Sequence, residues 1–244
     1  MDVNKPAQAE QPHSESSGYL ATTIDIFASP AAAFARIERR PTILFPLLLV
    51  VLPMLLVTAW YMQIVDEAWM LDDMIGRFGD MPPEQAEAIR NAASQSSMSL
   101  WSTLLGSAVS VTFLYGLHAG YLTLASLMSG DRFRFRHWFS LLCWTNLPML
   151  LVTLVMAVNI LLNTNGQLSL YDANSLSLAS LGLSSESVGI RTLLDAFSLP
   201  LIWALALLVA AYHQWLHCGW LRATLVVLAP YLLIIAVVFF FAFR

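Results

Sequence analysis

The chain has 244 residues, of which 58% are hydrophobic and 11% are charged, and its formal net charge is −4. Ordinary soluble domains carry roughly 25% charged residues, so a soluble fold would expose much of this apolar surface to water. The length allows one compact bundle with short tails and no second globular domain. The composition therefore indicates an integral membrane protein, excludes most classes of soluble enzyme, and gives no reason to expect nucleic acid as a partner.

The first 22 residues are polar and rich in Ser, Gln, Glu and Pro, a composition typical of a disordered cytoplasmic tail. They contain no apolar segment ahead of a cleavage site, so they do not resemble a targeting sequence. From residue 23 to residue 244 the pattern favours a single membrane domain.

A short amphipathic helix is predicted before the first span. Ser29 is a preferred N-cap residue, and Pro30 suits the first helical position because its missing N–H leaves no hydrogen bond unmade. The helix places Phe34 and Ile37 on one side, with three arginines nearer the other: Arg36, Arg39 and Arg40. Such a helix either lies in the headgroup layer with its arginines toward anionic lipid, or packs on the bundle as a cap.

Five long stretches are almost free of Lys, Arg, Asp and Glu. A helix rises about 1.5 Å per residue, so about 20 apolar residues cross a hydrocarbon core of about 30 Å. Each stretch is long enough, and we expect an all-α integral membrane fold with five transmembrane helices in one bundle. The predicted spans are residues 42–65, 98–128, 138–162, 196–216 and 222–243.

The basic residues near the span ends predict the orientation. Eight Lys and Arg residues lie on the side of the N-terminus and four on the opposite side, where the first loop also holds seven acidic residues. Because Lys and Arg near span ends are retained in the cytoplasm, we expect a cytoplasmic N-terminus and an external C-terminus. The expected location is the cell inner (cytoplasmic) membrane.

The two predicted external connections differ in character. In the first, residues 66–97, Pro83 marks a helix start with Glu84 and Glu87 in its favourable first turn, and the pattern is compatible with a helix that continues into the second span. The second, residues 163–191, is poor in charge. Its pattern leaves both a short interfacial helix and irregular structure open.

Polar and small residues within the spans are the candidates for intramembrane contacts. Gly116 and Gly120 have the small-xxx-small spacing that lets helices approach closely, which favours packing within the bundle over a dimer. No Asp, Glu, Lys or Arg lies in the middle of a predicted span, which argues against ion-coupled transport because coupled pathways use such groups. The residues that could line a transport path are His118, Thr145, Asn146 and Asn159.

His213 and His217 are weak candidates for metal binding. Their i, i+4 spacing puts both imidazoles on one helix face. The acidic residue of a zinc-protease motif is missing, and the neighbouring aromatic residues Tyr212, Trp215 and Trp220 are typical of an interfacial anchor. No nucleophile elbow, phosphate loop or pair of catalytic carboxylates occurs, so we expect no catalytic residue, no bound metal and no cofactor.

The order of several motifs resembles that of a known family. These motifs are Asp25-Ile-Phe-Ala-Ser-Pro30, Arg40-Pro41, Leu44-Phe-Pro46, Gly130-Asp131-Arg132, Trp144-Thr-Asn-Leu-Pro148, and the series Trp203, Tyr212, Gly219, Arg222 and Pro230. Over residues 24–243 the chain resembles bacterial members of the Yip family, membrane proteins with the Ypt/Rab-interacting-protein domain.

The resemblance implies a five-helix membrane protein without a catalytic motif. Eukaryotic relatives are proteins of Golgi and endoplasmic-reticulum membranes, linked to vesicle traffic through Rab GTPases and to membrane shaping. Their partner-binding segment lies in a long cytoplasmic N-terminal region. Here about 40 residues precede the first span, and the acidic-aromatic signature of those relatives is missing, so a Rab partner is not expected.

The leading hypothesis is a non-enzymatic integral membrane protein that organises partners or lipids. We expect contact with the bilayer, with anionic lipids at the cytoplasmic face, and with an unidentified membrane protein or a second copy of the chain. A plain topology signal would explain the same arginines. The alternatives are a small-solute transporter or permease subunit and a metal-dependent membrane enzyme. The residues expected to face lipid or a partner are Phe34, Arg36, Arg39, Arg40, Arg132, Arg134 and Arg136.

Overall fold

The computed structural model describes residues 15–77, 81–95, 100–131, 133–163 and 165–242 of the chain. These residues are almost entirely helical. In chain order the elements are α1 (Glu15–Ala28), α2 (Pro30–Arg39), α3 (Leu44–Ile64), α4 (Glu67–Gly76), α5 (Pro83–Gln95), α6 (Leu100–Leu127), α7 (Phe135–Thr145), the 3-10 turn η1 (Leu147–Met149), α8 (Leu150–Leu162), α9 (Leu170–Ala173), α10 (Val188–Ala196), α11 (Leu199–Leu216) and α12 (Trp220–Ala242). The predicted all-α fold is confirmed.

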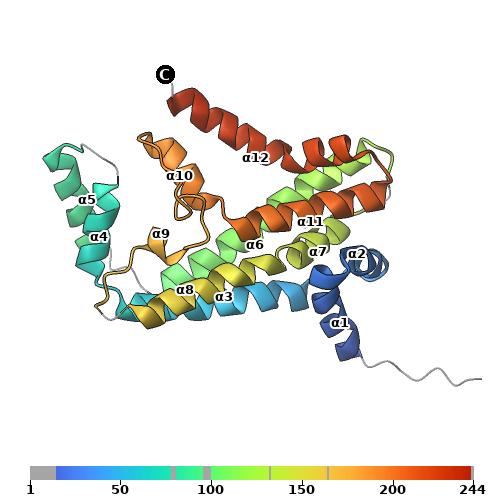
Figure 1. Ribbon diagram of the computed structural model, residues 1–244, viewed down its shortest axis with the longest axis horizontal. Helices are drawn as coiled ribbons and strands as arrows, with labels where there is room; N and C mark the ends of the chain where they lie inside the picture. The colour runs from blue at the N-terminus through green and yellow to red at the C-terminus, as the bar shows by residue number, and fades with distance from the viewer. Residues whose placement is uncertain (1–14, 78–80, 96–99, 132, 164, 243–244) are drawn as a thin grey trace, which may run out of the picture.

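Five helical segments within the described residues are long and apolar enough to cross a membrane. They are α3, α6, the segment Phe135–Leu162, α11 and α12. Most of them run along the long axis of the molecule in Figure 1, with α4 and α5 at one end and α1 and α2 near the other. The expectation of five transmembrane helices is confirmed, and each predicted limit lies within a few residues of the observed one.

The third span is broken in its middle. It consists of α7, η1 and α8, and the break falls at Pro148, which cannot donate a backbone hydrogen bond to the preceding turn. Just before the break, the backbone N–H and the side-chain amide of Asn146 both donate to the carbonyl of Leu142, at 3.1 Å and 2.8 Å. The residues from Trp138 to Thr145 are all buried, so α7 forms the centre of the bundle.

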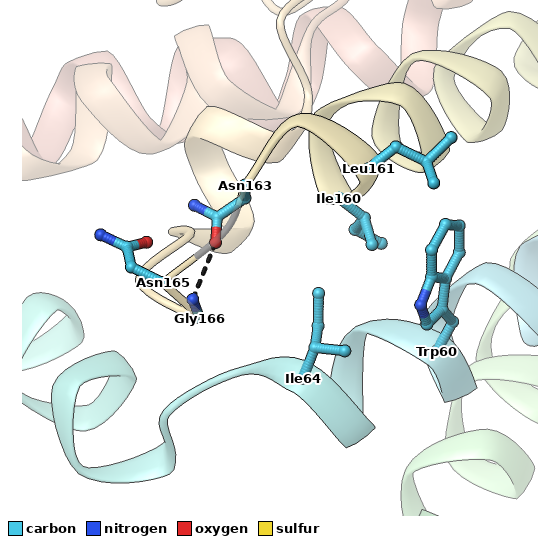
Figure 2. A pocket seen from close by; sticks show the side chains of 7 residues that line it. All are labelled: Trp60, Ile64, Ile160, Leu161, Asn163, Asn165 and Gly166. Atoms are coloured by element: carbon cyan, nitrogen blue, oxygen red, sulfur yellow. Dashed lines mark hydrogen bonds between the residues drawn. The ribbon is translucent and has the colours of Figure 1, made fainter.

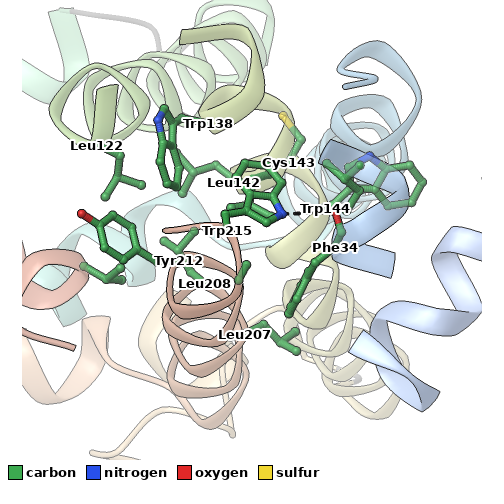
Figure 3. Close-up of a cluster of buried hydrophobic side chains, with 14 of the residues drawn as sticks. Phe34, Leu122, Trp138, Leu142, Cys143, Trp144, Leu207, Leu208, Tyr212 and Trp215 are labelled. Atoms are coloured by element: carbon green, nitrogen blue, oxygen red, sulfur yellow. Dashed lines mark hydrogen bonds between the residues drawn. The ribbon is translucent and has the colours of Figure 1, made fainter. Parts of the chain in front are cut away.

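The main hydrophobic core lies where α7 meets α2, α6 and α11 (Figure 3). The ring of Trp138 stacks on Tyr212 with 5.4 Å between centroids, and the indole N–H of Trp215 donates to the carbonyl of Phe34 at 3.2 Å. The prediction that Tyr212 and Trp215 anchor the membrane interface is wrong. Both are buried, because α2 and α7 pack against this end of α11.

The N-terminal helix α1 begins at Glu15, inside the range predicted as a tail. The tail boundary at residue 22 is therefore corrected, and residues 1–14 lie outside the described part of the chain. The physical reason is tertiary packing, since Ile26 of α1 is fully buried in the core. The next helix, α2, begins at Pro30 as predicted, although the side chain of its N-cap residue Ser29 makes no capping hydrogen bond.

The connections at the end of the molecule opposite α1 and α2 (Figure 1) contain four short helices: α4, α5, α9 and α10. Of these, α5 begins at the predicted Pro83, and residues 96–99 between α5 and α6 lie outside the described residues. The second connection combines both forms left open by its sequence, since α9 and α10 are joined by irregular backbone. We refer to α4, α5, α9 and α10 together as the loop end.

Candidate functional site

Most of the predicted site residues lie at one end of the bundle. We call this the basic end and define it as α1, α2 with the following residue Arg40, the described residues 128–131 and 133–136 that lead from α6 into α7, and the turn of residues 217–219 between α11 and α12. Its segments are tied together, since Arg222 at the start of α12 hydrogen-bonds to Ser129 after α6. At the same end, Gln214 donates to the carbonyl of Ala31 at 3.1 Å.

Arg36 joins the two N-terminal helices. Its guanidinium forms an ion pair with Asp25 of α1 and donates to the hydroxyl of Thr22 at 3.1 Å. The sequence pattern gave no sign of this ion pair, because it did not show that α1 folds back on α2. Arg36 thus helps to hold α2 in place, while Arg39 and Arg40 at the end of the helix are exposed.

Phe34 does not face the lipid. Its side chain is 1% exposed and packs in the main core (Figure 3), so the expectation that it contacts lipid or a partner is corrected. The physical reason is that α2 packs on α11 and α7, which places its apolar side against the bundle. Of the two alternatives left open by the sequence, α2 therefore packs on the bundle as a cap, and its exposed arginines lie on the side away from the core.

Two of the predicted arginines lie where α7 begins, Arg134 as its N-cap residue and Arg136 as its second residue. Arg134 and Arg136 are exposed, and neither forms an ion pair with any residue that the structure describes. Between them Phe135 is 45% exposed, whereas Phe133 turns inward and stacks on Trp215 at 4.9 Å between centroids. The third arginine predicted between α6 and α7, Arg132, lies outside the described residues.

The two metal candidates form no site with a third ligand. His213 stacks on Trp220 at 4.1 Å between ring centroids, and its Nδ1 contacts the carbonyl of Cys218. His217 ends α11 with a left-handed backbone, at φ 45°. Within the described ranges, no three His, Cys, Asp or Glu side chains are grouped so that they could hold a metal ion.

The four polar residues proposed for a transport path make separate contacts. Thr145 and Asn146 both bond to the backbone one turn earlier in α7. Asn159 instead donates to the carbonyl of Ala173 at 3.0 Å, in the connection after α8. His118 lines a groove between α6 and α12, and none of the other three lines that groove. The structure thus gives these four residues no shared path.

A hollow of about 480 Å³ lies at the loop end, where α3 and α8 finish (Figure 2). At the edge of the hollow, the backbone N–H of Gly166 donates to the side-chain oxygen of Asn163 at 2.9 Å. The carbonyl of Gly166 accepts a hydrogen bond from the N–H of Asp66 at 3.0 Å. Gly166 has φ +73°, and a Cβ there would lie 2.6 Å from the carbonyl oxygen of Ile64. Only glycine fits this turn without strain, so the hollow is part of a structural junction.

The same end holds a polar network that the sequence pattern did not predict. Arg77 donates to Asp73 at 3.2 Å and to the hydroxyl of Ser169 at 3.1 Å, and it lies 4.2 Å above the ring centroid of Tyr171. Arg77 and Ser169 are 92 residues apart, so no local pattern links them. Nearby, partial burial raises the pKa of the Asp195 carboxyl, and the positive charge of Arg77 lowers that pKa by a smaller amount. The network fixes the connections to one another.

Comparison with known proteins gives one family. A family model described as the Yip1 domain matches residues 24–242, which include all five spans, all of α2 and the last five residues of α1. No curated protein and no solved structure matches the chain.

Proposed function

The chain belongs to the Yip1 domain family, and from this premise we propose that it is a non-enzymatic membrane protein that gathers anionic lipids at its basic end. The observation that carries the proposal is the pair Arg134 and Arg136, exposed where α7 begins and without an ion-pair partner among the described residues. Arg39 and Arg40 extend the same charge from the end of α2.

The chemistry of these side chains suits phospholipid headgroups. A guanidinium presents a planar set of donors that matches phosphate oxygens, and the phenyl ring of Phe135 between the two arginines can enter the acyl boundary. Each Lys or Arg near an anionic membrane surface contributes about 1 kcal/mol. For Arg39, Arg134 and Arg136 together this amounts to about 3 kcal/mol, which is sufficient to change the lipid composition around the protein.

The proposal includes an orientation and a location. With the basic end in the cytoplasm, the arginines face the leaflet that carries anionic lipid, in accord with the positive-inside rule. The membrane is then the cell inner membrane. The same surface would receive a membrane-protein partner or a second copy of the chain, brought to the lipids that it gathers.

The test is the composition of the lipid shell. The full chain is reconstituted in vesicles of equal parts phosphatidylglycerol and phosphatidylcholine, extracted with its surrounding lipid by a copolymer, and the two lipids are quantified. We expect enrichment of phosphatidylglycerol, and its loss when Arg39, Arg134 and Arg136 are replaced by Gln. The matched control is Arg90→Gln at the loop end, where Arg90 is exposed and pairs with Asp72. If the wild type and the triple variant carried the same proportion of phosphatidylglycerol in their lipid shells, the proposal would be refuted.

A further inference from the structure

A groove of about 990 Å³ runs along the membrane-spanning surface between α6 and α12. Residues 114–124 of α6 and 229–234 of α12 contribute its walls, and Phe135, the first residue of α7, lines it as well. Five of its lining side chains are more than half exposed: Leu114, Leu117, Leu124, Leu233 and Ile234. Because these side chains belong to two spans, the groove opens toward the hydrocarbon of the bilayer and not toward water.

The groove exists because the two helices meet near one point and then diverge. Pro230 has no N–H, so the carbonyl of Val226 lacks its helical partner, and the hydroxyl of Tyr121 donates to it at 2.9 Å. After this contact the C-terminal half of α12 runs away from α6 toward α10 (Figure 1). The hydrogen bond that Pro230 makes possible thus joins α6 to α12 beside the groove.

The two glycines of the small-xxx-small pair contribute to this groove. A Cβ on Gly116 would lie 3.9 Å from the ring of Phe139, an ordinary packing distance, whereas a Cβ on Gly120 would meet no atom within 4 Å. The expected packing within the bundle therefore holds for Gly116 toward α7 and not for Gly120. Within the same groove, Nε2 of His118 is buried and has no hydrogen-bond partner among the described residues. The groove is consequently an unfilled packing surface.

The length of the groove identifies its occupant. Residues 114–124 rise about 15 Å along α6, which is half of a hydrocarbon core of about 30 Å. Phe135, which lines the groove, is the first residue of α7 and belongs to the basic end. A transmembrane helix from a second copy needs the full thickness of the core, whereas one acyl chain spans a single leaflet. A lipid chain of the leaflet at the basic end therefore fits better than a helix.

We propose that the α6–α12 groove binds one acyl chain of a phospholipid from the leaflet at the basic end, with the phosphate of that lipid beside Arg134 and Arg136. Both arginines are neighbours of Phe135 in the chain and are exposed, so a headgroup at this level meets guanidinium groups. The proposed binding of an acyl chain rests only on the geometry of the groove. The preference for an anionic headgroup rests on the proposed function.

The test uses the full chain, reconstituted in vesicles of phosphatidylglycerol and phosphatidylcholine, transferred to a mild detergent and examined by native mass spectrometry. We expect one retained phospholipid per wild-type chain. Gly120→Leu places a side chain in the groove and should reduce retention several-fold, and Gly120→Ala should reduce it less. The matched control is Gly106→Leu on the same helix, where a Cβ also meets no atom within 4 Å and which does not line the groove.

The outcomes separate the two proposals. If Gly120→Leu retains as much phospholipid as wild type, the acyl-chain seat is refuted, whatever the headgroup. If Gly120→Leu leaves lipid retention unchanged but converts a dimer to a monomer, the groove holds a second copy and the inference is overturned. The double variant Arg134→Gln with Arg136→Gln should keep the bound lipid and lose the preference for phosphatidylglycerol. A preference that survives in this variant would contradict the proposed function while leaving the seat intact.

Discussion

Replacing Gly166 by alanine tests whether the turn after α8 supports the end of α3. The residue has φ +73°, a conformation that costs an L-residue about 1–2 kcal/mol. The added Cβ would lie 2.6 Å from the carbonyl oxygen of Ile64, so backbone must move. That movement would weaken the 3.0 Å hydrogen bond from the N–H of Asp66 to the carbonyl of Gly166, at a further cost of about 1 kcal/mol. We therefore expect a destabilisation of about 2–3 kcal/mol.

Gly182→Ala is the matched control for this prediction. Gly182 also has a positive φ, +98°, but a Cβ there would meet no atom within 4 Å. The control carries the conformational cost without the steric clash. The assay is thermal unfolding of both purified variants in the same detergent, followed by tryptophan fluorescence. We expect a clearly larger loss of melting temperature for Gly166→Ala, and equal losses in the two variants would refute the reasoning.

Three further substitutions test separate contacts. Asp25→Asn breaks the ion pair with Arg36 and, because both side chains are partly exposed, should cost about 1 kcal/mol or less in unfolding free energy and increase hydrogen exchange in α1. His118→Phe removes a buried Nε2 that has no hydrogen-bond partner among the described residues, and it should leave stability unchanged or raise it by about 1 kcal/mol, measured by unfolding in detergent; a large loss would show that the imidazole makes a stabilising polar contact. Burial raises the pKa of Asp195, so the charged form destabilises the fold as pH rises through the folded pKa. The Asp195→Asn variant should therefore be more stable than wild type at neutral pH, and this difference in stability should vanish when the pH falls below 3.8, the ordinary pKa of an Asp carboxyl. A difference in stability that does not change with pH would contradict this prediction.

The sequence predicted the membrane-spanning part of the fold well, because its signal is local. An apolar stretch without charges must form a helix in lipid, where each backbone polar group needs an internal partner. The limits of the five spans followed from the charged residues that flank them. The start of α2 at Pro30 also followed from local chemistry, since proline suits the first position of a helix.

The side chains at the basic end were harder to predict, because their roles depend on tertiary packing. Tyr212 and Trp215 have the composition of an interfacial belt, yet α2 and α7 cover them. Phe34 was expected to face lipid or a partner because it lies on the apolar side of an amphipathic helix, and α7 and α11 cover that side. Sequence periodicity shows that a helix has an apolar side, but it does not show whether lipid or protein covers that side.

The network at the loop end and the α6–α12 groove had no local signal. Arg77 contacts Ser169 and Asp172, which are 92 and 95 positions away in the chain, and these contacts hold the end of α4 against α9. The groove depends on where α6 and α12 cross. Pro230 and Gly120 were visible in the sequence, but their relation appears only when Tyr121 is seen to donate to the carbonyl of Val226.

The central claim is that the basic end gathers anionic phospholipid, and photo-cross-linking locates this contact most directly. The full chain is reconstituted with phosphatidylglycerol that carries a photoactivatable headgroup, irradiated, digested, and the modified peptides are identified by mass spectrometry. We predict adducts concentrated in residues 30–40 and 133–137. Adducts of equal yield at the loop end, in residues 66–77 and 165–196, would contradict the account.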